Sequence, residues 1–197
     1  MTESLIDLNE RLWQAVMVDA VEEAKFLIQC GADIGYMMAD RSLLDVAVSK
    51  GCVNAVKLLL KAGADVNSMF YCTTTSIVLA CELGNKEIVE TLLEAGADVN
   101  DVGVSGLSPL IAASAFNKMD LVSLLLERGA YPDIKDHDGR TALFYACRHG
   151  SKMVEVLLKY GADPSIEDKS GNTCHDRILC KNNDIYKLLR EALPKEL

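Results

Sequence analysis

The chain has 197 residues, half of them apolar and a quarter charged, so it has enough apolar side chains for a folded core and is not expected to be disordered. Its 29 acidic and 20 basic residues give a net charge of −9, which repels phosphate backbones and anionic lipid headgroups, and we expect neither nucleic acid nor membrane as a partner. No uncharged run is longer than 102–117, and this run is shorter than the roughly 20 apolar residues of a membrane span.

The first residues and the cysteines indicate the compartment. The segment 1–16 contains Glu3, Asp7, Glu10 and Arg11 and therefore lacks the basic start and apolar run of a secretory signal. The 7 cysteines form an odd set without a CxxC pair. This usage is typical of a reducing compartment, so we expect a cytoplasmic protein, with the nucleus as the alternative.

A repeat of about 33 residues runs along the chain. Gly-Ala pairs recur at intervals of 32, 33, 33 and 32 residues, and each follows a leucine-rich segment. The pairs begin at Gly31, Gly63, Gly96, Gly129 and Gly161. Apolar residues at helical spacing predict short amphipathic helices over 56–60, 88–93, 121–126 and 153–158. Each glycine is expected to end its helix, because glycine adopts the left-handed conformation at little cost.

A second, alanine-rich helix is predicted upstream of each leucine-rich one. These helices cover 44–49, 77–83, 110–116 and 143–149. Their shared small residues, expected where neighbouring layers approach closely, are Ala47, Ala80, Ala113 and Ala146. The hydroxyl residues that precede the helices and can cap them are Ser42, Thr75, Ser108 and Thr141. Polar turns with Ser105-Gly106 and Asp138-Gly139 predict tight hairpins between repeats.

This order of helix, turn, helix and hairpin resembles the ankyrin repeat. The residues that carry the resemblance are 136–143 with 161–163, 63–67 and 96–100. The resemblance implies an all-α repeat solenoid, an ankyrin-type stack of about six helix-turn-helix units joined by β-hairpin loops, with residues 1–197 forming a single domain. Its layers lie near 8–34, 35–67, 68–100, 101–133, 134–166 and 167–197, and the first and last are expected to be end caps.

The sequence departs from the family pattern at the start of each first helix. The family's threonine-proline-leucine-histidine motif keeps its histidine nowhere, so we expect weaker helix capping. The residues at that position are Asp45, Val78, Ile111, Phe144 and Asp176. In the third hairpin Thr73 replaces the tip glycine, and a β-branched residue disfavours positive φ. We therefore expect the loop from Ser68 to Thr74 to differ from the others.

No catalytic motif is present in the sequence. None of the 3 histidines lies in a nucleophile motif, and glycine-rich phosphate-binding loops are missing, so we predict neither an enzyme nor a cofactor. A cryptic enzyme or metal protein remains the alternative from another class. Potential ligands crowd the last two layers, at Cys147, His149, Cys174, His175 and Cys180. Their spacing fits no zinc finger, and we favour Cys147 as a small core residue packed near Cys180, with His149 facing solvent.

Two asparagines are candidates for modification. Asn67 and Asn100 close Asp-Val-Asn segments that, in this family, are targets of asparagine hydroxylation in some organisms. The alternative, which we favour, is structural: each asparagine bonds to its own turn. Neither reading changes the predicted fold.

The resemblance implies a protein partner that docks on the hairpin tips and on the inner face of the first helices. The matching residues are Tyr36, Met38, Arg41, Met69, Tyr71, Leu83, Val104, Leu107, Phe116, His137, Arg140, Arg148 and His149. We expect Tyr71 and Phe116 to be the anchors, because large aromatic residues dominate interface energies. The alternative is that the apolar tips pack on one another.

We therefore predict a non-enzymatic adaptor or stoichiometric inhibitor, monomeric when free, that buries about 800 Å² of its own surface on a protein. A transcriptional or ubiquitin-pathway subunit is the second hypothesis. It would need a recruiting segment outside the repeats, and none is visible in the sequence.

Overall fold

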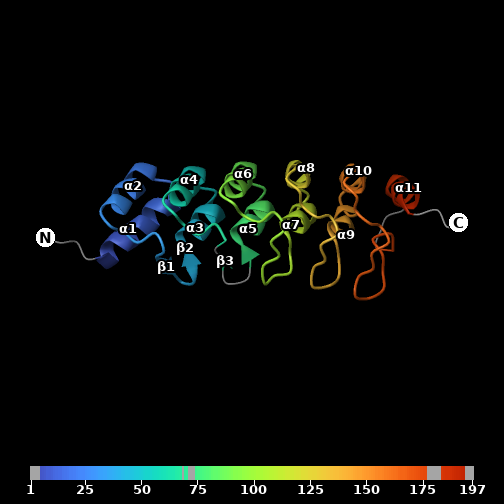
Figure 1. Cartoon of the computed structure of the whole chain (residues 1–197), viewed down its shortest axis with the longest axis horizontal. Coiled ribbons are helices and arrows are strands. Elements are labelled where there is room, and N and C mark those ends of the chain that lie inside the picture. Colours follow the sequence, from blue (N-terminus) through green and yellow to red (C-terminus); the bar gives the residue numbers. More distant parts are fainter. Residues whose placement is uncertain (1–4, 68, 71–73, 177–182, 194–197) are drawn as a thin grey trace. The chain divides into compact units, whose positions relative to one another are not determined.

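The chain folds into helix-turn-helix layers joined by hairpin loops, as predicted (Figure 1). The computed structural model describes residues 5–67, 69–70, 74–176 and 183–193. Within these ranges, no helix combines the length and apolar character needed to cross a membrane. The fold comprises two compact units, residues 1–98 and 99–197, which we call unit 1 and unit 2. The assignment of all six layers to one domain stays a prediction.

Unit 1 contains three helix pairs and two hairpins. The pairs are α1 (Leu5–Met17) with α2 (Val21–Gln29), α3 (Leu43–Lys50) with α4 (Val53–Lys61), and α5 (Ser76–Leu83) with α6 (Lys86–Glu94). Antiparallel strands β1 (Met37–Met38) and β2 (Arg41–Ser42) form one hairpin, and β3 (Met69–Phe70) and β4 (Thr74–Thr75) form the other. In Figure 1 the first helices of the pairs form one row and the second helices form another. The row of first helices lies between the second helices and the hairpins.

Unit 2 repeats this arrangement. Its helices are α7 (Pro109–Ala115), α8 (Met119–Glu127), α9 (Ala142–Ala146), α10 (Ser151–Lys159) and α11 (Asn183–Ala192). Helix α9 ends before the predicted His149, because the backbone tightens there: the amides of Arg148 and His149 bond to carbonyls only three residues back. An isolated bridge between Glu167 and Thr173 closes the last hairpin.

The core follows the repeat. The alanines predicted at close approach are fully buried: Ala47 and Ala80 in unit 1, Ala113 and Ala146 in unit 2. The five glycines after the second helices have φ between +88° and +99°, and an added Cβ would meet nothing within 4 Å. Backbone conformation and not lack of space therefore requires glycine at these positions.

The expectation of weaker capping is wrong at Asp45. Its Oδ2 accepts bonds from the backbone N–H of Ser42 at 3.1 Å and from the Ser42 hydroxyl at 2.7 Å, and the Asp45 N–H donates to Ser42 Oγ at 3.1 Å. The other oxygen, Oδ1, accepts from the Ser76 hydroxyl of the next layer at 2.9 Å. An acid at the family's histidine position thus caps its own helix and links two layers.

The expectation is confirmed in the layers of Val78 and Phe144, but it is wrong in the layer of Ile111, whose backbone N–H donates to Ser108 Oγ at 3.2 Å. Thr75 and Thr141 make no side-chain cap bond, and within the described ranges their buried hydroxyls have no hydrogen-bond partner. Val78 and Phe144, which occupy the histidine position in these layers, offer no polar group. These two helices therefore begin without the bond that Asp45 supplies to α3.

The structure does not test the prediction that the hairpin tip of the third layer, 68–74, differs from the other hairpin tips. Residues 68 and 71–73 lie outside the described part of the chain, so this expectation stays a prediction. The flanking strands are described, and Phe70 pairs with Thr74.

The hairpins of unit 2 touch through their backbones. The N–H of Lys169 donates to the carbonyl of Asp138 at 2.8 Å, which joins the last two hairpins. Gly139 has a φ of +80°, and a Cβ added there would lie 3.0 Å from the Lys169 nitrogen. Gly171 has a similar φ of +75°, but an added Cβ would meet nothing within 4 Å.

Replacing the buried Asp45 tests its role in linking layers. Asp45→Ala should lower the free energy of unfolding by about 3 kcal/mol, because donors on the half-buried Ser42 and the buried Ser76 lose their acceptor. Thr141→Val is the matched control, since it removes a hydroxyl that has no partner and should cost nothing or add up to about 1 kcal/mol. Urea unfolding measures both, and equal losses would contradict this account.

Gly139→Ala and Gly171→Ala separate backbone strain from close approach. Each substitution should cost about 1 kcal/mol for placing a side chain at positive φ. Gly139→Ala should cost roughly 1 kcal/mol more, because the new methyl group crowds the Lys169 backbone. Thermal unfolding of the two variants checks the difference. Identical melting temperatures would show that the hairpins move apart to accept the methyl group without loss of stability.

Candidate functional site

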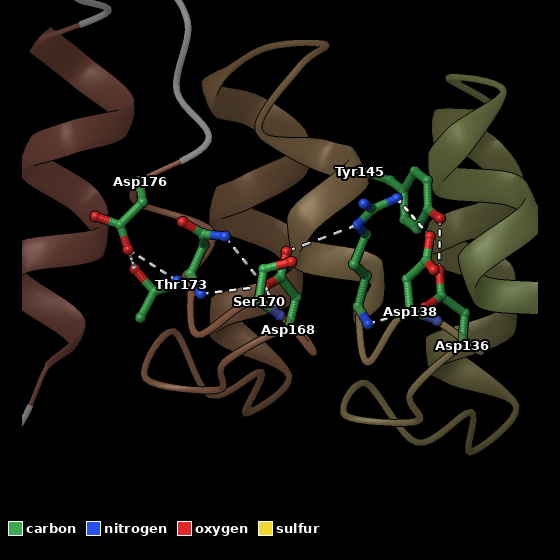
Figure 2. A network of polar contacts seen from close by, with 9 residues as sticks. Asp136, Asp138, Tyr145, Asp168, Ser170, Thr173 and Asp176 are labelled. Carbon is green, nitrogen blue, oxygen red and sulfur yellow. Dashed lines mark hydrogen bonds and ion pairs between the residues drawn. The ribbon is translucent and has the colours of Figure 1, made fainter.

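The hairpin at the start of the fifth layer is held by Asp136, as Figure 2 shows. Its Oδ1 accepts the N–H groups of Asp138 at 2.8 Å and Arg140 at 2.9 Å, and its Oδ2 accepts the Tyr145 hydroxyl at 2.6 Å. Burial raises the pKa of Tyr145, and its bond to Asp136 raises it further, so the phenol remains a donor. The loop is therefore fixed before any partner arrives.

Arg140, one of the predicted partner contacts, lies between two hairpins. Its Nη1 is 2.9 Å from Asp138 Oδ2, and its Nε is 3.9 Å from Asp168 Oδ2. The buried Asp168 also accepts the N–H groups of Ser170 and Asn172 (Figure 2). Arg140 is half-buried and paired with carboxylates of the protein itself, which makes its charge less available to a partner.

His137, Val104 and Leu107 lie at the neighbouring tips. The ring of the exposed His137 lies against Gly106, where an added Cβ would be 2.6 Å from His137 Cδ2. Val104 is 60% exposed, and Leu107 is half-buried. Val104 is therefore the more exposed of the two apolar tip residues predicted in unit 2.

Phe116 lies where α7 ends. Asn117 follows it with a φ of +56°, a left-handed conformation that asparagine tolerates, and the Lys118 N–H bonds back to the Ala113 carbonyl at 2.8 Å. This turn directs Phe116 away from the core, and its side chain is 53% exposed.

His149 is positioned beside this helix end. Its Nε2 lies 2.9 Å from the Ala115 carbonyl oxygen, which can only accept, so Nε2 carries the hydrogen. The bond satisfies a carbonyl in the last turn of α7, where the helix dipole favours a donor. It also holds the exposed His149 next to the residue that precedes Phe116.

We call residues 115–118 and 147–152 the α7–α9 rim. It contains the cations Lys118, Arg148 and Lys152, and no acidic residue. Arg148 and Lys152 are exposed, and Lys118 is half-buried. Among the described residues none of these three cations forms an ion pair. The predicted contacts Phe116, Arg148 and His149 thus lie in two neighbouring segments whose charged residues are all basic.

In unit 1 the predicted residues are less exposed. Leu83, at the end of α5, is 49% exposed. Tyr36 and the hairpin residues Met38 and Arg41 are half-buried. Tyr71 lies outside the described residues, and the structure does not describe the Met69 side chain.

Four exposed apolar residues of unit 1 were missed: Met17, Val18, Phe26 and Met37. Val18, 74% exposed, follows α1 at the repeat position that Leu83 and Phe116 occupy in later layers. Met37, 55% exposed, precedes the predicted Met38 on β1. The repeat spacing could have identified Val18, whereas the strand register that exposes Met37 is not visible in the sequence.

The cysteines of unit 2 behave as core residues. Cys147 and Cys174 are buried, and Cys174 Sγ donates to the Pro164 carbonyl at 3.6 Å. A hydrogen bond with Cys174, together with burial, raises the pKa of the Cys147 thiol. Cys147 therefore fits the predicted core role, but its described neighbour is Cys174, and Cys180 lies outside the described residues. In the part of the chain that the structure describes, no three potential ligands come together as a metal site.

Asn100 does not bond only within its own turn, contrary to the favoured reading. Its Oδ1 accepts the Tyr131 N–H at 2.8 Å, and its Nδ2 donates to the Gly129 carbonyl at 3.4 Å, both in the next layer. At Asn67 the backbone N–H donates to Asp65 Oδ1 at 3.0 Å, so the carboxylate of Asp65 closes this local turn. Hydroxylation of Asn67 or Asn100 stays a prediction.

Comparisons with known proteins agree with this geometry. The family model described as ankyrin repeats (3 copies) matches residues 12–103 and 77–168. A crystal structure of an ankyrin repeat domain from Acinetobacter baumannii is 28% identical with a TM-score of 0.85, over 92% of this chain and 96% of that one. The E3 ubiquitin-protein ligase XBAT33 of Arabidopsis thaliana is 41% identical over 83 residues, which are 41% of this chain and 16% of the ligase. The chain belongs to the ankyrin repeat family, whose repeats bind protein partners.

Proposed function

We propose that this chain is a non-enzymatic adaptor or stoichiometric inhibitor that binds a protein through the ends of its first helices and its hairpin tips. The observation that carries the proposal is the repeated exposure of a large apolar residue at one repeat position. Leu83, the last residue of α5, and Phe116, which directly follows α7, are both about half exposed, although most of the residues of these two helices are buried. Exposed apolar groups at equivalent places favour a contact surface over chance.

The backbone around these residues favours binding at low entropic cost. In unit 2, the turn after Phe116 is fixed by the bonds of residues 116–118, and His149 is held by Ala115. A preorganised surface loses little conformational freedom when a partner docks, so a few anchors suffice for affinity. The mechanism is occupancy: the bound partner is masked or placed beside another protein. We expect the free chain to be monomeric and located in the cytoplasm.

A ubiquitin-pathway role is the second candidate, and the likeness to XBAT33 favours it. In that role the repeats would hold a protein for modification by an associated ligase. Because the matching segment covers only 16% of that ligase, the likeness supports the binding half of such a function. Ubiquitin ligase subunits among captured proteins would favour this candidate over the inhibitor.

Phe116→Glu should abolish partner capture while the protein stays folded. A charge at an apolar anchor should weaken binding at least about tenfold, because its burial in the interface then requires desolvation of a carboxylate. Capture from native lysate, quantified by mass spectrometry, compares the variant with the original chain, and circular dichroism verifies folding. Tyr71→Glu tests the second anchor predicted from the sequence in the same assay.

Tyr131→Glu is the matched control for Phe116→Glu. Tyr131 is also aromatic, lies in unit 2 and is 67% exposed, but it follows α8 and not the end of a first helix. It should leave capture unchanged. If Phe116→Glu retains the same proteins as the original chain, the proposed surface is wrong.

A further inference from the structure

We propose that the α7–α9 rim binds an acidic peptide segment that carries one apolar anchor residue. This inference rests on the proposed function and names the chemistry of its partner. The rim combines the exposed cations Arg148 and Lys152 with the exposed aromatic side chain of Phe116, and it lies wholly within unit 2.

The charge of the rim is opposite to that of the chain. The whole chain has a net charge of −9, yet the two rim segments contain Lys118, Arg148 and Lys152 without a carboxylate. Elsewhere in unit 2, Arg140 is neutralised by Asp138 and Asp168. The rim cations form no ion pair among the described residues, so a partner's carboxylates would meet charges that the protein itself does not satisfy. Such complementarity selects acidic partners and speeds their association.

The aromatic side chain supplies the apolar part of the recognition. Phe116 is 53% exposed, and the bond from His149 Nε2 to the Ala115 carbonyl places the imidazole beside it. Arg148 directly precedes His149 in the chain. A peptide that places one apolar residue on Phe116 therefore has cations within reach of its flanking acids.

A peptide fits this surface better than a nucleic acid. Phosphate backbones are held by many cations spread over a long surface, because affinity depends on the number of neutralised phosphates. The rim offers three cations, and the rest of the chain is strongly acidic. Carboxylates interspersed with an apolar residue match both the small number of charges and the exposed phenyl ring.

The test is an NMR titration of the full ¹⁵N-labelled chain with three synthetic peptides. EDEFEDE carries acids around one phenylalanine, EDEGEDE lacks the apolar residue, and KRKFKRK reverses the charge. We expect EDEFEDE to shift the amides of 115–118 and 147–152 and to bind about tenfold more tightly than EDEGEDE. KRKFKRK should not bind, and added salt should weaken EDEFEDE.

Matched variants locate the site. Arg148→Glu should weaken EDEFEDE about fivefold or more, whereas Lys159→Glu, an exposed cation at the end of α10, should leave it unchanged. Phe116→Ala should remove the preference for EDEFEDE over EDEGEDE, and Tyr131→Ala should preserve it. Because all four side chains are exposed or at helix ends, the variants are expected to fold, which their NMR spectra check.

Several results would overturn the proposal: no binding of EDEFEDE up to millimolar concentration, equal binding of KRKFKRK, shifts outside the rim, or tighter binding of oligothymidylate than of EDEFEDE. Failure here is distinguishable from failure of the proposed function. If Phe116→Glu still abolishes capture from lysate, the interaction surface stands and only the acidic class of partner is wrong. If capture is also unchanged, both proposals fall.

Discussion

Each helix pair buries its apolar face only because a neighbouring pair lies against it, and this dependence governs both units. The fully buried Ala47 and Ala80 allow α3 and α5 to approach, and Ala113 and Ala146 do the same for α7 and α9. Polar side chains then join one layer to the next. Asn100 bonds to the backbone of the following layer, as does Asp133, whose Oδ1 accepts the Asp163 N–H at 2.9 Å. Cohesion is therefore a sum of contacts between neighbours.

Those contacts also decide which surfaces remain for a partner. In the hairpins of the fifth and sixth layers, the carboxylates and Arg140 bond to groups of these two hairpins. Phe116 and Leu83, at the ends of first helices, are not needed to hold the fold in this way. The left-handed residues that follow them direct their side chains outward. Among the described residues, the ends of the first helices thus offer more exposed apolar surface than most of the hairpin tips.

Periodicity was sufficient to predict the helices from α3 to α10, because the leucine spacing and the glycines that follow are local signals. The end of α9 and the role of Asp45 were not predictable in this way. Asp45 acts through Ser76, 31 residues later, and a pattern within one repeat does not reveal a partner in the next. The basic rim has the same origin: residues 115–118 and 147–152 become one surface only when two layers pack. Val18, by contrast, was accessible from the repeat register alone.

The buried carboxylate of Asp45 also constrains how this protein can evolve. Its acceptor capacity is matched to the hydroxyl of Ser76 in the following layer, and the same position holds Pro109 and then Ala142 further along the chain. Unequal recombination that deleted the third layer would set a proline against a desolvated anion. Repeats that look interchangeable by their consensus are therefore not equivalent, and loss of the third layer would require a compensating mutation at Asp45.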